Sequence, residues 1–147
     1  GGGEDLIAAL GGNSSRHADG AYRDVAHHVR SQTLLAAKAR GKFALDSVFL
    51  DIEDPDGLAA ESDDAVAVGF DGKVAIHPRQ VPLIRAAYAP TDSEVQWARG
   101  ILDAVVVNRG VFTYEGRMVD APVAHQAERI LARCGNTAPH GHLSSST

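Results

Sequence analysis

The sequence lacks the features that mark several common classes of protein. Its one cysteine, Cys134, excludes an internal disulfide and a zinc site built from several cysteines. No apolar run approaches the roughly 18 residues of a membrane-spanning helix, so we expect no membrane partner. The start of the chain, Gly1–Asp5, has neither a basic nor an apolar leader region. We therefore expect no signal peptide and a reducing, cytoplasmic setting.

Positive charge and phosphate-binding loops are also scarce. Fourteen Lys and Arg residues stand against nineteen Asp and Glu residues, which gives a formal net charge of -5. Proteins that bind nucleic acid normally carry the opposite balance, because clustered cations supply their affinity for phosphate. The sequence also contains no GxGxxG or Walker A pattern. We expect neither a nucleic-acid partner nor a nucleotide held by such a loop.

The apolar residues that are present predict helices alternating with short strands. With 44% hydrophobic and 22% charged residues, the chain has enough apolar content for a globular core. Strands separated by amphipathic helices favour βα units and a parallel sheet. The expected helices cover residues 6–10, 21–40, 58–68, 78–88 and 92–105, and the expected strands cover 45–52 and 73–77. Thr91 and Glu94 predict a capping box at the start of the last of these helices.

The end of the chain predicts a different module. Residues 111–120 indicate a small hairpin or an extended arm, and a helix follows over 122–133. Two strands are too few for a closed parallel barrel, which needs about 250 residues. The chain therefore forms either a small open sheet or part of something larger.

One segment carries a family resemblance. Gly69 to Gln80 reads GFDGKVAIHPRQ, which resembles the GF-x-GK-x-x-IHP-x-Q signature of citrate lyase beta-subunit-like proteins, members of the HpcH/HpaI aldolase superfamily. The similarity is to the stand-alone actinobacterial type rather than to the subunit of a fermentative citrate lyase complex. Four further segments resemble family motifs in the same order: Gly3–Leu6 with Leu10–Gly11, Leu50–Leu58, Tyr88–Glu94 and Gly116–Pro122.

The resemblance implies an α/β fold in which this chain is the C-terminal part of a (β/α)8 TIM barrel. Residues 1–109 would form the C-terminal half of the barrel. Residues 110–134 would form a C-terminal arm and helix that reach a neighbouring subunit, typically in a homotrimer, and 135–147 would be a disordered tail. The family's metal-binding Glu and substrate-binding Arg would then lie outside the sequence given.

The implied activity is that of a carbon–carbon lyase. Family members cleave or form C–C bonds in acyl-CoA thioesters with Mg²⁺, and substrates of the citramalyl-, malyl- or hydroxymethylglutaryl-CoA kind are expected. Two alternatives stay open. The chain could belong to a pyruvate-dependent aldolase of the same superfamily that acts on free acids, or it could be an inactive truncated remnant.

Two aspartates are the main site candidates. Taken by themselves, Asp5 and Asp120 each suit the N-cap of a following helix. The family's metal-binding Asp falls on Asp5, and a carboxylate is a ligand that Mg²⁺ prefers. The resemblance likewise places a catalytic carboxylate on Asp120, delivered across the subunit interface. We expect Asp5 to bind the metal and Asp120 to act as general acid and base.

Weaker candidates follow the two expected strands. Asp51 and His77 are expected to line the substrate pocket, although an acidic residue after a strand more often caps a helix or faces solvent. Lys73 could meet the phosphates of CoA, although solvated surface is the simpler account of its position.

Overall fold

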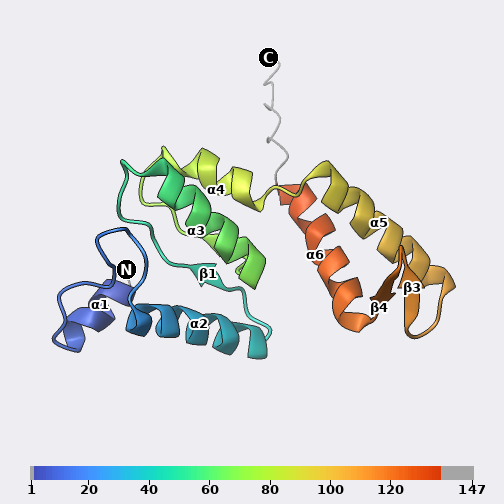
Figure 1. Cartoon of the computed structure of the whole chain (residues 1–147), viewed down its shortest axis with the longest axis horizontal. Helices are drawn as coiled ribbons and strands as arrows, with labels where there is room; N and C mark the ends of the chain where they lie inside the picture. The colour runs from blue at the N-terminus through green and yellow to red at the C-terminus, as the bar shows by residue number, and fades with distance from the viewer. Residues whose placement is uncertain (1, 137–147) are drawn as a thin grey trace, which may run out of the picture. The chain divides into compact units, whose positions relative to one another are not determined.

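The computed structural model describes residues 2–136, which form two compact units (Figure 1). The first unit ends at Tyr88 and the second begins at Ala89. The fold is mixed α/β, and helices account for most of it. The boundary that we expect after residue 109, between the C-terminal half of a barrel and its C-terminal arm, stays a prediction. No helix among the described residues has both the length and the apolarity needed to cross a membrane.

The first unit is built around a short parallel strand pair. Leu45 pairs with Gly72, and Asp46 pairs with Lys73. Helices flank β1 on both sides in Figure 1. In chain order, the elements of this unit are α1 (Gly2–Ala9), α2 (Asp24–Ala39), β1 (Leu45–Asp46), α3 (Pro55–Val68), β2 (Gly72–Lys73) and α4 (Gln80–Tyr88).

Both strands are shorter than the sequence predicts. We expected them over 45–52 and 73–77, but only two residues of each are paired. Among residues 2–136 no third strand joins this sheet. A segment of β-branched and apolar residues forms a ladder only where a neighbour offers hydrogen bonds, so the rest of each segment is left outside the sheet.

Helix α3 begins earlier than expected because of its cap. Asp54 is the N-cap, and its side chain accepts a hydrogen bond of 2.9 Å from the Gly57 backbone N–H. Pro55 then occupies the first turn, where its missing N–H costs nothing. A Cβ on Gly57 would lie 2.8 Å from Cζ of Phe49, so only glycine lets the capped turn pack this closely.

Two small apolar clusters hold the helices of the first unit together. Phe49, Leu58 and Ile84 are buried where α3 packs on α4. Ala44, Ala65 and Phe70 are buried against the inner face of α2. Both ends of the paired strands are therefore anchored to helices, which fixes the positions of the side chains between them.

The second unit contains α5 (Asp92–Val107), β3 (Phe112–Tyr114), β4 (Arg117–Val119) and α6 (Ala121–Asn136). The hairpin that residues 111–120 predict is confirmed: Phe112 pairs with Val119 across an antiparallel ladder. Its turn places Glu115 at φ 46° and Gly116 at φ 77°, the left-handed pair typical of a tight hairpin. Gly135 and Asn136 belong to α6. The rest of the tail expected over 135–147 lies outside the described residues.

One continuous core joins α5, the hairpin and α6. Its buried members are Ala98, Ile101, Val119, Ala127 and Ile130, and Trp97 packs against them. The capping box expected at the start of α5 is also confirmed. The Thr91 side chain accepts from the Glu94 backbone, and Glu94 accepts from the Thr91 backbone N–H at 2.7 Å.

The capping box gives a test of stability in the second unit. Replacing Thr91 with Ala removes an acceptor for a helix N–H, and we expect a loss of about 1 kcal/mol in the free energy of unfolding. Urea unfolding followed by the fluorescence of Trp97, the only tryptophan, measures this unit. Glu128→Ala, which removes an exposed pair with His125 on α6, is the matched control and should change stability by less than about 0.5 kcal/mol. Equal effects of the two substitutions would contradict the role of the cap.

Candidate active site

A buried ionic centre occupies the middle of the first unit. We define it as Lys73, Asp46, Glu61, Arg16 and Arg30. The Lys73 side chain is fully buried, and its ammonium donates to Asp46 Oδ2 at 2.8 Å and to Glu61 Oε1 at 2.7 Å. Its third bond goes to the Ser47 backbone carbonyl at 2.9 Å. An ammonium has three donors, so Lys73 is fully satisfied without water.

Two arginines complete the charge balance around Lys73. Arg30, on α2, donates to both carboxylate oxygens of Asp46 at 2.7 and 3.2 Å, and to Asp64 at 2.6 Å. Arg16 holds Glu61 in the same two-bond manner at 2.6 and 3.1 Å. Forked arginine–carboxylate pairs of this kind fix orientation as well as charge.

Tyr22 connects the ionic centre to its surroundings. Its hydroxyl lies 2.6 Å from Ser47 Oγ and donates to Glu61 at 3.1 Å. The guanidinium carbon of Arg16 lies 3.9 Å above the Tyr22 ring, a cation–π contact, and 5.1 Å from the Phe49 ring. The loop that carries Arg16 and Tyr22 is therefore bound to the ionic centre by charge, hydroxyl and ring together.

Burial and charge pairing act in opposite directions on the pKa values of the two carboxylates in the ionic centre. Burial by itself would raise the pKa of Asp46, but hydrogen bonds from Arg30 and Lys73 outweigh it and lower the pKa. Burial would also raise the pKa of Glu61, and the bonds from Arg16 and Lys73 lower it instead. Burial raises the pKa of the Tyr22 hydroxyl. Both carboxylates therefore stay charged at neutral pH.

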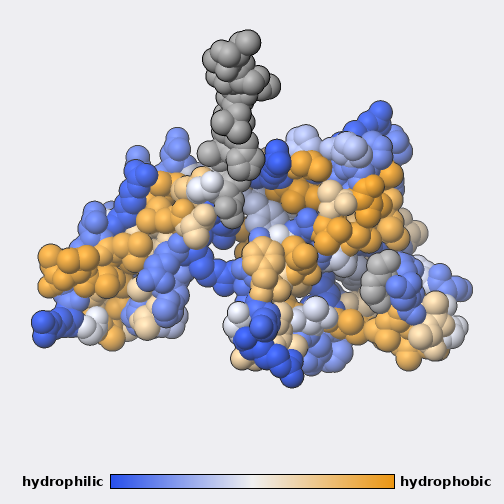
Figure 2. Space-filling view, turned by 180° about the vertical axis from the view of Figure 1, so that it is seen from behind, coloured by the Kyte–Doolittle hydropathy of each residue, from blue (hydrophilic) through white to orange (hydrophobic). Residues whose placement is uncertain are grey.

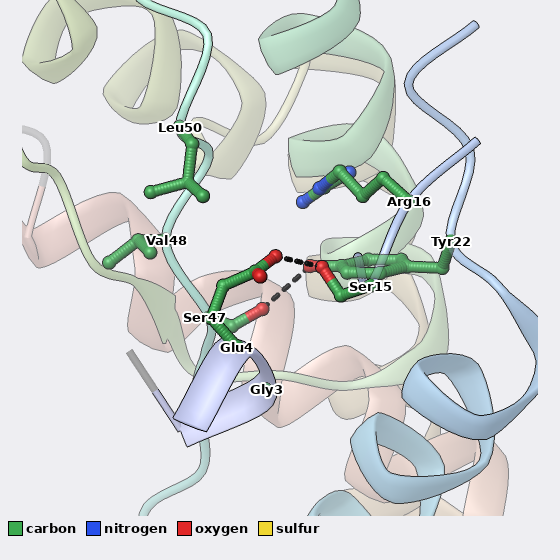
Figure 3. A pocket seen from close by; sticks show the side chains of 8 residues that line it. All are labelled: Gly3, Glu4, Ser15, Arg16, Tyr22, Ser47, Val48 and Leu50. Atoms are coloured by element: carbon green, nitrogen blue, oxygen red, sulfur yellow. Dashed lines mark hydrogen bonds between the residues drawn. The ribbon is translucent and has the colours of Figure 1, made fainter. Parts of the chain in front are cut away.

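A small pocket lies beside this centre, at the start of α1 (Figure 3). The Ser15 hydroxyl, which is buried, donates to the Glu4 carboxylate and so joins α1 to the following loop. The free volume of the pocket is about 20 Å³, room for a single water rather than a substrate. Its residues are Gly3, Glu4, Ser15, Arg16, Tyr22, Ser47, Val48 and Leu50.

A larger cleft lies along residues 45–48, between β1 and α2. Its volume is about 490 Å³, within the range of pockets that bind small molecules. Apolar side chains such as Val29, Leu45 and Phe70 form much of its wall. Arg30 and Asp46 reach its surface while remaining paired with each other.

The predicted site residues do not form one constellation. Asp5 is exposed and lies inside the first turn of α1, so its alternative role as an N-cap is wrong. Asp51 is exposed, and its side chain accepts from the Glu53 backbone N–H at 3.0 Å. The His77 ring nitrogen Nδ1 accepts from the Arg79 backbone N–H at 3.1 Å. Neither bond ties these residues to the ionic centre.

Asp120 lies in the second unit, at the start of α6. Its Oδ1 accepts from the Val123 backbone N–H at 3.2 Å, and its carbonyl accepts from Ala124, as an N-cap does. The side chain is exposed. The capping role expected from the sequence is therefore present, and the catalytic role stays a prediction.

The described residues supply only part of a metal site. No group of three His, Cys, Asp or Glu side chains in residues 2–136 is placed to hold an ion. Asp5 offers one exposed carboxylate, which suits a hydrated ion such as Mg²⁺ that takes one or two carboxylates and keeps several waters. The donor chemistry fits Mg²⁺, but these residues do not complete its site.

Sequence reasoning missed the ionic centre. Lys73 was expected to be a solvated residue or a contact for phosphate, and its burial shows that this was wrong. One pattern could have indicated the pair: Asp46 and Lys73 are opposite charges within two apolar segments that were both expected to be strands of a parallel sheet. Charges of opposite sign in neighbouring buried strands require each other.

Known proteins similar to this chain share one family. The family described as HpcH/HpaI aldolase/citrate lyase matches residues 2–78. A citrate lyase subunit beta-like protein of Mycobacterium tuberculosis is 59% identical over 134 residues, which cover 91% of this chain and 49% of that protein. The mitochondrial citramalyl-CoA lyase of Mus musculus is 36% identical, over 88% of this chain and 38% of the enzyme. The chain thus spans half or less of the length of these relatives.

Solved structures show the same likeness. A crystal structure of the M. tuberculosis protein CitE, in complex with magnesium, acetoacetate and coenzyme A, superimposes with a TM-score of 0.79 at 59% identity. It covers 90% of this chain, and the chain covers 50% of it. Another structure of CitE, with magnesium and pyruvate, gives a TM-score of 0.65.

Removing the central cation tests the ionic centre. Lys73→Met leaves Asp46 and Glu61 buried without their shared partner, and we expect a loss of about 3–5 kcal/mol in the free energy of unfolding. Urea unfolding followed by far-UV circular dichroism measures it. Arg79→Met is the matched control, because Arg79 lies 3.8 Å from Glu53 in an exposed pair, and it should have almost no effect. If both variants were equally stable, the centre would not hold the unit together.

The lowered pKa values predict a stability loss in acid. Because the pKa values of Asp46 and Glu61 are lower in the folded chain than in the unfolded one, the stability they give is complete above the unfolded values, about 4. It is lost as the pH falls through the lower folded values. We expect the urea midpoint of the first unit to stay level from pH 8 to 5 and to fall below pH 4. A decline that begins above pH 6 would point to other groups.

Proposed function

The chain belongs to the HpcH/HpaI aldolase/citrate lyase family, and we propose that it is part of a Mg²⁺-dependent lyase that cleaves or forms a C–C bond in an acyl-CoA thioester. One observation carries this proposal. The M. tuberculosis protein whose structure holds magnesium, acetoacetate and coenzyme A is 59% identical over almost all of this chain. The relatives named citramalyl-CoA lyase support the same chemistry.

The proposed fold is the C-terminal part of a (β/α)8 barrel. The parallel pairing of β1 with β2, with α3 between them in sequence, is the βα unit of which such barrels consist. We propose that β3, β4 and α6 form an arm that reaches a neighbouring subunit of a homotrimer. A cytoplasmic location is proposed with it.

Asp5 is the residue we propose as a ligand of Mg²⁺. It lies on the first turn of α1 with its carboxylate exposed, and further ligands would come from residues outside this chain. When bound, the ion would neutralise negative charge on the substrate oxygens. Ser15 and Glu4 hold α1 beside the ionic centre, so the position of Asp5 is fixed by the first unit.

Asp120 is the residue we propose to move the proton. In cleavage of a 3-hydroxyacyl-CoA, its carboxylate accepts the proton of the hydroxyl group. The bond between the α and β carbons then breaks, the β carbon becomes a carbonyl, and the electron pair passes to the thioester as an enolate. Return of the proton to the α carbon completes the reaction. Asp51 and His77 stay weak candidates for the substrate pocket.

A second candidate function is a pyruvate-dependent aldolase on free acids. The structure of CitE with magnesium and pyruvate favours it. A chimera separates the two: the matched residues of the M. tuberculosis relative are replaced by this chain, and the product is assayed on citramalyl-, malyl- and hydroxymethylglutaryl-CoA and on the free hydroxy-keto acids. Cleavage of a CoA thioester supports the lyase, and cleavage of free acids alone supports the aldolase. A folded chimera that cleaves neither would support an inactive remnant.

The same chimera tests Asp120. Asp120→Asn keeps the shape of the side chain but removes its ability to accept a proton, so we expect kcat to fall by about 10²–10⁴-fold. Mg²⁺ affinity by titration calorimetry and the melting temperature should be unchanged. Asp63→Asn, which alters an exposed carboxylate on α3, is the control and should retain full activity. An unchanged rate in Asp120→Asn would remove this residue from the mechanism.

A further inference from the structure

One buried glutamine joins the two segments that follow β1 and β2. In the described part of the chain, the last backbone bond between these segments runs from the Val74 N–H to the Asp46 carbonyl, at 3.3 Å. Beyond it the amide of Gln80 lies between them. Its Nε2 donates to the Phe49 carbonyl at 2.8 Å, and its Oε1 accepts from the Ile76 N–H at 2.9 Å. A side-chain amide thus takes the place of a direct bond of the ladder.

The Gln80 amide sets the separation of the two segments. The residue is only 2% exposed, and both polar atoms of its amide are bonded to backbone groups. A buried amide that lost either bond would leave polar groups unsatisfied, which is costly. The distance between the segments past the ladder therefore depends on one side chain.

The segment after β2 stays extended as far as His77. Figure 2 shows hydrophobic residues among hydrophilic ones at the surface of the chain, and Val74 and Ile76 are two of the exposed apolar residues. Between and after them, Ala75 and His77 are half-buried. Exposure that alternates in this way is typical of an extended segment with one face covered. Gln80 therefore holds an extended segment that ends at His77.

The ring of His77 is held in one tautomer. Its Nδ1 accepts a hydrogen bond of 3.1 Å from the Arg79 backbone N–H. Nδ1 therefore carries no proton, and a neutral imidazole must carry its proton on Nε2. Among the described residues, none forms a hydrogen bond with this Nε2. In its neutral form His77 thus offers an N–H donor that is not yet used.

Gln80 also fixes the backbone on both sides of this ring. Its side chain bonds Ile76, which precedes His77, and its backbone N–H donates to the His77 carbonyl at 3.0 Å. A pocket of about 250 Å³ lies between the two segments. Asp51 lines it after β1, and Arg79 and Gln80 line it after β2. Ligands of α/β folds bind where neighbouring parallel strands end, so this pocket lies where a substrate is expected.

We propose that Gln80 is a positioning residue, which holds His77 so that its Nε2–H donates a hydrogen bond to the thioester oxygen of the acyl-CoA substrate. The inference rests on the proposed function. In that reaction the thioester oxygen gains negative charge when the bond between the α and β carbons breaks. A fixed N–H donor stabilises such charge without giving up its proton. His77 contacts the substrate, and Gln80 acts through His77.

Two replacements of His77 in the chimera with the M. tuberculosis relative test the contact. In His77→Asn the new Oδ1 can still accept from the Arg79 N–H, but no donor remains at the position of Nε2. We expect kcat to fall by about 10²–10³-fold, with an unchanged melting temperature. In His77→Gln the amide nitrogen reaches the position of Nε2, so kcat should exceed that of His77→Asn. His28→Asn, which alters an exposed histidine on α2, is the matched control and should retain full activity.

A double substitution tests whether Gln80 acts through His77. Gln80→Met keeps the volume of the side chain and loses both amide bonds. We expect kcat to fall by about 10–10²-fold, and the Ile76 amide to exchange its hydrogen faster. In the His77→Asn background, Gln80→Met should lower kcat no further, because the two residues act as one unit. Gln32→Met, at an exposed position on α2, is the matched control and should change neither quantity.

A measurement on the unsubstituted chimera does not depend on the folding of Gln80→Met. Nitrogen-15 NMR distinguishes the two neutral tautomers of histidine, and the signals that His77→Gln removes belong to His77. We expect the proton on Nε2 alone. We also expect the Nε2 signal to move when acetyl-CoA, a small thioester of the same carrier, is added.

The outcomes separate this contact from the proposed function. A proton on Nδ1 of His77, an unchanged kcat in His77→Asn, or equal losses from Gln80→Met with and without the His77 ring would overturn the inference. So would an Nε2 signal that acetyl-CoA leaves in place. A chimera that cleaves no thioester, but whose Nε2 signal responds to acetyl-CoA, rejects the proposed function and supports the contact.

Discussion

The first unit depends on one fully desolvated ammonium group. A charge taken out of water is costly unless every one of its donors finds an acceptor. Lys73 meets this condition with two carboxylates and one carbonyl, from two different parts of the chain, Asp46–Ser47 and Glu61. Because Asp46 lies on β1, Glu61 on α3 and Lys73 on β2, the requirement fixes these elements relative to one another. The ion pairs thus reinforce the register that the short ladder shows.

The same requirement extends to the elements that carry the proposed chemistry. Glu61 is shared by Lys73, Arg16 and Tyr22, so the loop before α2 is bound to the strand pair. That loop also carries Ser15, which holds Glu4 and thereby α1. Asp5, the proposed metal ligand, is next to Glu4 on the helix. Hydrogen bonds thus link the buried lysine, through Glu61 and the loop before α2, to Glu4, the sequence neighbour of Asp5.

Local signals in the sequence predicted local structure well. The capping box at Thr91 and the hairpin over 111–120 each depend on contacts between near neighbours, and both are confirmed. The strands were overestimated, because a ladder depends on a partner that hydrophobic pattern alone does not show. The ionic centre was missed for a related reason. Asp46 and Lys73 are separated by 26 residues in the sequence, and each resembles a surface charge until the pairing of the strands is known. For Asp120, local sequence predicted the cap that the structure shows, whereas its proposed catalytic role comes from the family resemblance.

The two units differ in how far they complete their own cores. The second uses an antiparallel hairpin, which tolerates water on one face, and it packs that hairpin against a pair of helices around a continuous core. The first uses parallel strands, which need cover on both faces, and six of the eight buried apolar residues described in it fall into two separate clusters of three. Exposed apolar side chains gather where that cover is absent from the described residues. The first unit therefore relies on the paired charges of its ionic centre, where the second relies on one continuous apolar core.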